Sequence, residues 1–174
     1  NGIAGVIPGN TDKLLLKKVG KRSKGRANAK IGDDGSGKSS IAIVETPQNI
    51  RIETGLISAC IPRPGEFLID SIFHKGVKVG EHARLVCNTQ SDPILENTSQ
   101  IAFTNYAGRL KSATVERTGN VRALVKLEGI HRSDAGREWL PFVVRLYFYA
   151  GSEQIKIVHS FVYDGDQNKD FIRA

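Results

Sequence analysis

The chain has 174 residues, enough for one ordinary domain with a core of its own or for two small ones. With 40% hydrophobic and 25% charged residues, its composition excludes an intrinsically disordered protein. No apolar run approaches the roughly 20 residues of a membrane-spanning helix, which excludes a helical membrane anchor within this sequence. The sequence contains no methionine, so we expect a piece of a longer polypeptide.

The net charge of +7 comes from one segment near the N-terminus. Of the 25 Lys and Arg residues, eight lie in residues 13–30, KLLLKKVGKRSKGRANAK, which contain no acidic residue. The other 17 are balanced by 18 acidic residues. We therefore divide the chain into a basic arm, residues 1–30, and a single β-domain, residues 31–174. The arm is either a solvated extension or a binding segment for an acidic polysaccharide, a lipid surface or nucleic acid. Nucleic acid is the less expected partner, because the arm has no aromatic residue to stack on a base.

Residues 32–40, GDDGSGKSS, satisfy the phosphate-loop pattern G-x-x-x-x-G-K-[ST]. A working phosphate loop follows a buried strand and opens a helix, whose positive end meets the phosphate. Here the preceding residues are basic, and the following SIAIVETPQNIRIETG alternates apolar and polar residues on both sides of Pro47. This pattern predicts strand, turn, strand. We interpret the match as a turn rich in Gly, Asp and Ser, not as a nucleotide site.

Short apolar runs separated by turn residues continue along the chain. GLISACIP, EFLIDSIFH and VKVGEHARLVC predict strands, and residues 91–100, SDPILENTSQ, predict a loop. Thr118-Gly119-Asn120 joins two alternating runs, in the second of which Ala123, Val125 and Leu127 share one face with Val121.

The strongest pair of elements lies near the C-terminus, where two long β-branched and aromatic runs meet at Ala150-Gly151-Ser152. Val144, Leu146 and Phe148 line one face of the first run. Pro141 is expected near a strand start or on an edge, because it cannot donate a ladder hydrogen bond. We predict an all-β domain of roughly ten mostly antiparallel strands, closed as a barrel or stacked as a sandwich.

Few residues indicate local chemistry. The four histidines are far apart in the sequence and form no metal-binding pair. His159 stands on an apolar face, as a core or rim histidine or, alternatively, as a proton-transfer group in a groove. Cys60 and Cys87 are expected to be two free buried thiols, with a disulfide as the alternative.

Two sets of polar residues are candidate sites. Asp164, Asp166, Asn168 and Asp170 alternate as in a calcium loop, although Lys169 replaces the glycine of an EF-hand; the alternative is an acidic loop that caps the last long strand and contacts a following domain. For sugar binding, Trp139 would be an aromatic platform at a sheet rim or, alternatively, a core residue. Arg109, Arg137 and Arg145 suit bidentate recognition of a carboxylate.

Three extended stretches carry a resemblance: IRIETGLISACIPRPGEFLIDSIFHKGVKVG, SATVERTGNVRALVKLEGIH and REWLPFVVRLYFYAGSEQIKIVHSFVYDGDQNKDFIRA. They resemble the exo-rhamnogalacturonan lyase family of polysaccharide lyases, from about Asp34 to Ala174. Asp34-Gly35-Ser36 and Lys38 match a turn of that family, and Ser39 replaces its aromatic residue. Family members begin with a RIFT-type barrel, continue through a β-sandwich and end in an α/α-toroid. They cleave the rhamnogalacturonan backbone of pectin by β-elimination, and many are bacterial.

The resemblance implies an exported protein whose first domain is this one and whose catalytic groups lie in the toroid. We therefore expect a non-catalytic N-terminal β-domain, with no cofactor, that packs against later domains of the same polypeptide. It would line the substrate groove with Trp139, Arg109, His131 and Arg145. Two other hypotheses are an independent carbohydrate-binding module and an anionic-polymer or nucleic-acid binder that works through residues 13–30.

Overall fold

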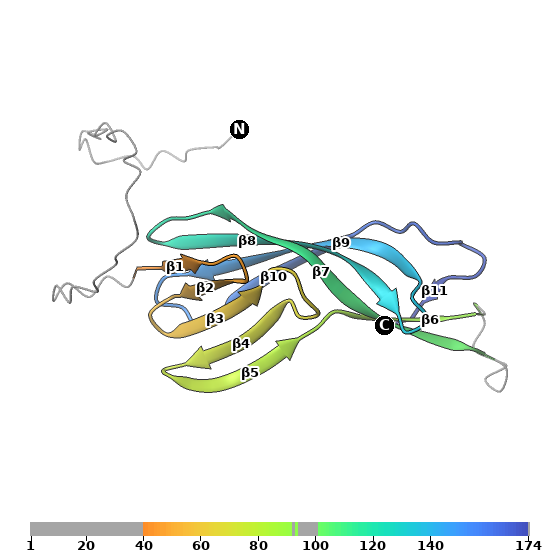
Figure 1. Ribbon diagram of the computed structural model, residues 1–174, viewed down its shortest axis with the longest axis horizontal. Coiled ribbons are helices and arrows are strands. Elements are labelled where there is room, and N and C mark those ends of the chain that lie inside the picture. The colour runs from red at the N-terminus through yellow and green to blue at the C-terminus, as the bar shows by residue number, and fades with distance from the viewer. Residues whose placement is uncertain (1–39, 92, 94–100, 174) are drawn as a thin grey trace, which may run out of the picture. The chain divides into compact units, whose positions relative to one another are not determined.

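The computed structural model describes residues 40–91, 93 and 101–173. The basic arm, the phosphate-loop-like stretch before Ser40 and most of the predicted loop 91–100 lie outside the described residues. The described chain forms eleven strands in two antiparallel sheets, with no helix in these ranges (Figure 1). The prediction of an all-β fold is confirmed, and the sandwich is the correct one of the two predicted architectures. The described ranges also contain no helix long and apolar enough to cross a membrane.

The five-stranded sheet is a simple meander in which each strand pairs with the next along the chain. Its strands are β1 (Ala42–Glu45), β2 (Asn49–Glu53), β3 (Ile57–Pro62), β4 (Ile69–His74) and β5 (Val77–Ala83). β1 and β2 are the strand, turn, strand predicted after the phosphate-loop pattern. Thr46 closes their turn, because its Oγ1 accepts a hydrogen bond of 3.0 Å from the Asn49 amide. No helix opens after Ser40, so the helix that a phosphate loop requires is replaced by a strand.

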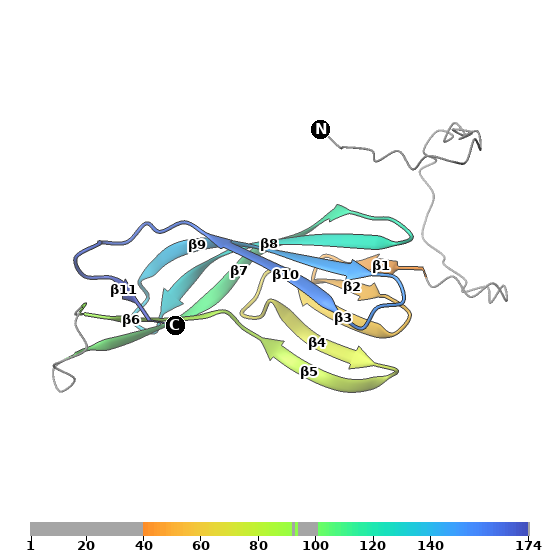
Figure 2. The ribbon, with the colours of Figure 1, turned by 180° about the vertical axis from the view of Figure 1, so that it is seen from behind.

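The six-stranded sheet has the order β10-β9-β8-β7-β6-β11. Its strands are β6 (Val86–Gln90), β7 (Phe103–Arg117), β8 (Arg122–Ser133), β9 (Glu138–Tyr149), β10 (Ile155–Phe161) and β11 (Phe171–Ile172). The two predicted turns lie between β7 and β8 and between β9 and β10. Figures 1 and 2 show that β7, β8 and β9 run on beyond the five-stranded sheet, toward β6 and β11.

The main core fills the space between the two sheets and is almost entirely aliphatic. In β9 the burial alternates, so the predicted face of Val144, Leu146 and Phe148 is fully buried while the residues between them are partly exposed. Each fully buried side chain of this size stabilises the fold by about 1.5–3 kcal/mol. The fully buried residues packed with them include Val125 and Leu127 on the neighbouring strand β8, and Ile50, Ile52, Ala59 and Ile61 on the five-stranded sheet.

Pro141 is the fourth residue of β9, near the strand start as predicted, but β9 is not an edge strand because it pairs with both β8 and β10. The register between β8 and β9 shifts beside Gly129 and His131, and Leu140 has a φ of 55°. Pro141 therefore occupies a bulge, where the ladder does not need its missing donor.

A second, smaller cluster lies where the six-stranded sheet extends past the other sheet. It consists of Cys87, Tyr106, Trp139 and Leu140. Residues 162–170, which we call the C-terminal strap, connect β10 to β11 and contact this cluster. Gly165 lies against the Trp139 ring, since a Cβ at this position would lie 2.4 Å from Cζ3 of the indole.

Candidate functional site

The outward face of the five-stranded sheet holds a row of polar and aromatic residues. In β2, Ile50 and Ile52 point into the core, so the residues that alternate with them, Arg51 and Glu53, point outward. The register places Glu53 opposite Ser58, and Ser58 opposite Phe73. Neighbouring strands thus carry these side chains on one face.

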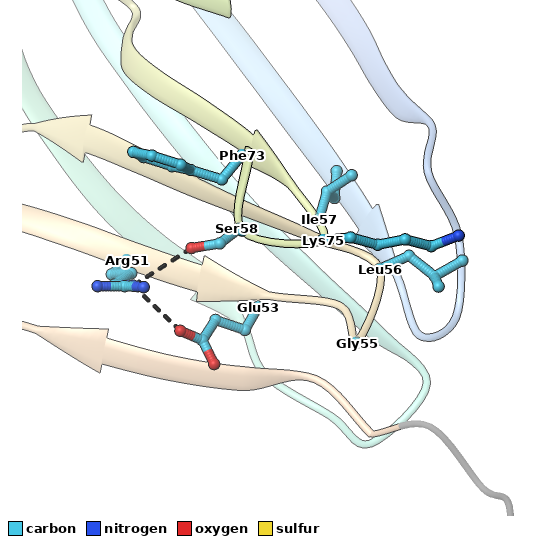
Figure 3. A pocket seen from close by; sticks show the side chains of 9 residues that line it. Arg51, Glu53, Gly55, Leu56, Ile57, Ser58, Phe73 and Lys75 are labelled. Carbon is cyan, nitrogen blue, oxygen red and sulfur yellow. Dashed lines mark hydrogen bonds and ion pairs between the residues drawn. The ribbon is translucent and has the colours of Figure 1, made fainter. Parts of the chain in front are cut away.

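The guanidinium of Arg51 is held in place through its Nε atom. Its Nε donates a hydrogen bond of 3.2 Å to the Ser58 hydroxyl and lies 3.1 Å from Oε1 of Glu53 (Figure 3). Its terminal nitrogens Nη1 and Nη2 have no partner among the described residues. The side chain is 57% exposed, so these two donors face solvent.

A hollow of about 460 Å³ lies over this row, within the size range of ligand pockets. Two hairpin turns border it, at Gly55-Leu56 and at Lys75-Gly76. Lys75 and Gly76 both have positive φ, 48° and 82°, as a two-residue type I′ turn requires. Figure 3 shows the Lys75 side chain extending away from Arg51. The hollow therefore combines an aromatic ring, a guanidinium, a hydroxyl and a carboxylate, which are the groups that recognise sugars.

Neither cysteine adds a reactive group to this face. Cys60 lies opposite Arg51 in the register, and burial together with the charge of Asp70 raises the pKa of its thiol. Burial also raises the pKa of the Cys87 thiol, in the other sheet. Both are free, as predicted, although Cys60 is only partly buried. A raised pKa keeps both groups in the unreactive thiol form.

Two of the residues predicted to bind substrate, Trp139 and His131, are only 2% and 1% exposed. The Trp139 ring packs against Tyr106 and Tyr163, each with a centroid distance of 5.6 Å. His131 Nδ1 lies 2.8 Å from the Leu140 carbonyl oxygen. Their burial leaves no ring face for a sugar, and of the two positions that the sequence allowed for Trp139, the core and the sheet rim, the structure shows the core.

His159 lies on the edge strand β10, with its ring centroid 6.5 Å from that of His131. Partial burial, and secondarily the charge of His131, lowers its pKa. It is a rim histidine on an exposed strand, and the lowered pKa favours its neutral form.

The two predicted arginines on the six-stranded sheet are exposed but already paired. Arg145 contacts Glu116 with both Nε (3.1 Å) and Nη2 (3.3 Å), and the pKa of Glu116 is lowered by that pairing. Arg109 pairs through Nη1 with Glu66, a carboxylate that also lies 3.9 Å from Arg84. The structure does not bring these arginines together with Trp139 or His131 at one hollow.

Of the predicted calcium ligands, Asp164 and Asp170 tie the C-terminal strap to β9 and the turn before it, whereas Asp166 accepts a hydrogen bond within the strap. Oδ1 of Asp164 accepts a 2.6 Å hydrogen bond from the Leu140 amide, and Oδ1 of Asp166 accepts one of 2.9 Å from the Asn168 amide. Each carboxylate thus has its own partner instead of pointing to a common centre. Across the described ranges, no group of three His, Cys, Asp or Glu side chains is placed to hold a metal ion.

The strongest of these ties joins Asp170 to Arg137. Both carboxylate oxygens accept hydrogen bonds of 2.6 Å from the guanidinium, which also lies over the Trp139 ring at 5.3 Å. The pairing holds the pKa of Asp170 below its usual range. The sequence predicted that Arg137 suits a carboxylate, but it did not indicate that this carboxylate is Asp170 of the same chain.

The fold and these contacts define an antiparallel β-sandwich domain. Residues 41–174 match the family model described as "PcRGLX-like protein central beta sandwich domain", and the chain belongs to this family. This is the rhamnogalacturonan-lyase-like family that the sequence resembles. The chain is also 32% identical over 136 residues to "Uncharacterized protein YetA" of Bacillus subtilis (strain 168). That match covers 78% of the chain but 16% of YetA, so the chain spans about one sixth of the relative's length.

Proposed function

We propose that this chain is a non-catalytic β-sandwich domain that stabilises a rhamnogalacturonan-lyase-like protein by packing against its other domains. The observation that carries this proposal is that the match is to the sandwich domain and covers only 16% of the relative YetA. β-Elimination needs a base, a cation and an acid around one carbon atom. The charges of Arg137, Arg145 and Asp170 are instead used in ion pairs within the domain.

The same match supports a middle position in the parent protein. The family model describes a central domain, whereas the resemblance in the sequence led us to expect the first one. We therefore place further domains on both sides of this one. Because the polymer that such a protein would act on is too large to enter a cell, we also propose that the parent protein is exported.

The test of the non-catalytic role is a turnover assay on rhamnogalacturonan. The full-length parent protein and this chain alone would be incubated with the polymer, and the unsaturated product followed by its ultraviolet absorbance. We expect product from the full-length protein and none from this chain. Product formed by this chain alone would overturn the proposal.

The stabilising role needs a separate measurement on the full-length protein. Phe148→Ala in the main core should lower the melting temperature of the whole parent protein, whereas Tyr147→Phe on the outward face should not. If Phe148→Ala left the rest of the parent protein with its original melting transition and full activity, the domain would not support its neighbours.

A second role, binding of carbohydrate, is favoured by the hollow on the five-stranded sheet. Arg51 presents its terminal nitrogens there, the Phe73 ring lines the same hollow, and neither side chain belongs to the main core. Binding of an anionic polymer through residues 13–30 stays a prediction, since those residues lie outside the described ranges.

A further inference from the structure

We propose that the hollow on the five-stranded sheet binds an acidic sugar, with Arg51 on the carboxylate and Phe73 against the ring. This inference rests on the carbohydrate-binding role proposed above and names its ligand and its residues. The hollow is lined by residues of β2, β3 and β4 together with two hairpin turns, so the backbone that positions the side chains is held by sheet hydrogen bonds.

Arg51 is oriented for a carboxylate. The contacts of Nε with Ser58 (3.2 Å) and Glu53 (3.1 Å) fix the plane of the guanidinium from its inner side. Nη1 and Nη2 then face outward as two parallel donors, the geometry that binds both oxygens of a carboxylate. A neutral hydroxymethyl group offers one oxygen, so it would use half of this arrangement.

A comparison with Arg145 shows what leaves the terminal nitrogens of Arg51 available for a ligand. Arg145 spends both Nε and Nη2 on the two oxygens of Glu116, so an internal carboxylate already occupies the bidentate position. Glu53 lies nearest to Arg51 at Nε, where one carboxylate oxygen is 3.1 Å away. The Glu53 carboxylate therefore orients the guanidinium of Arg51 and leaves its bidentate position, at Nη1 and Nη2, unoccupied.

Phe73 supplies the surface for the sugar ring. It lies opposite Ser58 in the register, on the outward face of β4, and its side chain is half-buried. Half-burial anchors the ring to the sheet and leaves part of it accessible to the apolar C–H face of a pyranose. Glu53 keeps its second oxygen without a partner in the described part of the chain, so it can accept a hydrogen bond from a sugar hydroxyl.

The same surroundings disfavour a phosphate group. A dianion would lie close to the Glu53 carboxylate, and Lys75 extends away from Arg51 and does not offset that repulsion (Figure 3). A phosphate also makes no use of the Phe73 ring. A single negative charge attached to a flat apolar ring fits the hollow better.

The test compares two sugars that differ in one group. The full chain would be titrated calorimetrically with a short galacturonic acid oligomer and with the corresponding galactose oligomer. We expect heat from the acidic oligomer and an affinity for the neutral one that is at least tenfold weaker. Equal binding of both oligomers, or no binding of either, would overturn the proposal.

Variants locate the site. Arg51→Ala should weaken binding of the acidic oligomer roughly ten- to a hundredfold, since it removes two charge-assisted hydrogen bonds. Phe73→Ala should weaken it roughly three- to tenfold. The matched control is Arg132→Ala, which removes an exposed arginine on the other sheet, 4.0 Å from Glu138, and should leave the affinity unchanged. Thermal melts would establish that all three variants fold.

Binding that survives Arg51→Ala and falls steeply with salt would place the acidic oligomer on residues 13–30 and overturn the assignment to this hollow. The turnover assay of the preceding section is independent of these titrations. If the domain does not bind acidic sugars, it can still be a non-catalytic support. If the chain alone turns over the polymer, the titrations still show whether Arg51 binds the acidic oligomer.

Discussion

The two ends of the six-stranded sheet are stabilised by different chemistry. Where it faces the five-stranded sheet, the core is aliphatic, with Val144, Leu146 and Phe148 fully buried. Beyond that sheet lies the smaller cluster of Cys87, Tyr106, Trp139 and Leu140, which we call the end cluster. The C-terminal strap covers it and is held there by the Arg137–Asp170 pair and by aromatic contacts of Trp139. A second sheet covers a large apolar surface and holds it without specific polar contacts. A single segment of chain covers less surface, so it needs specific hydrogen bonds and ion pairs to stay in place. The stability of the first end should therefore depend on the volume of its buried side chains, and that of the second end on the charges of its ion pair.

The largest effect is expected from Phe148→Ala in the main core. It removes a fully buried ring and leaves a cavity, which should lower the free energy of unfolding by about 3–5 kcal/mol. Urea denaturation measures this loss, with Tyr147→Phe on the outward face as the control. A loss below about 1 kcal/mol would mean that the main core does not depend on volume.

Asp170→Ala tests the end cluster. It removes both hydrogen bonds of 2.6 Å to Arg137, whose side chain is 48% exposed and can therefore be hydrated. We expect a loss of about 1–3 kcal/mol in the free energy of unfolding. Hydrogen exchange should accelerate at β11 and the strap but not at β9. Asp166→Ala, at an exposed carboxylate, is the control, and uniform acceleration through both sheets would contradict a local role.

Acid should weaken the end cluster before the main core. Because Arg137 lowers the pKa of Asp170 in the folded chain, the pair contributes stability above the unfolded pKa of about 3.9. That contribution should diminish below about pH 4 and be lost as the pH falls through the lowered pKa. Trp139 fluorescence during acid titration would report it. The same titration curve in Asp170→Asn would show that another group is responsible.

The smallest effect is expected from Arg145→Ala, on the outward face over the main core. Its pair with Glu116 is exposed and screened by solvent, so its removal should cost little stability, and less at high salt. Thermal melts at two salt concentrations would measure it. A loss as large as that of Asp170→Ala would contradict the contrast between the two ends.

The local patterns of the fold were predictable because they depend on neighbours in the sequence. Alternation at Val144, Leu146 and Phe148 and the turn at Gly151 both act within a few residues. The choice between sandwich and barrel was not predictable, because it depends on whether the edge strands of the two sheets pair. β11 joins β6 across more than 80 residues, and no local pattern indicates this pairing.

The candidate site was less predictable for the same reason. Arg51, Ser58 and Phe73 lie on three strands, and only their register brings them to one hollow. Trp139 follows a polar loop, which suggested an exposed position. It is buried because the strap, more than 20 residues later, covers it.

The strap also limits the length of its own connection. β10 and β11 occupy opposite edges of the six-stranded sheet, five strand spacings apart, or roughly 24 Å at about 4.8 Å each. Residues 162–170, fully extended between the two strands, reach at most roughly 33 Å, and three of them form a turn. The reach therefore exceeds this spacing by only roughly 9 Å, and the turn uses part of that excess. Deletions in the strap should for this reason weaken the pairing of β11 with β6 more than insertions of the same length.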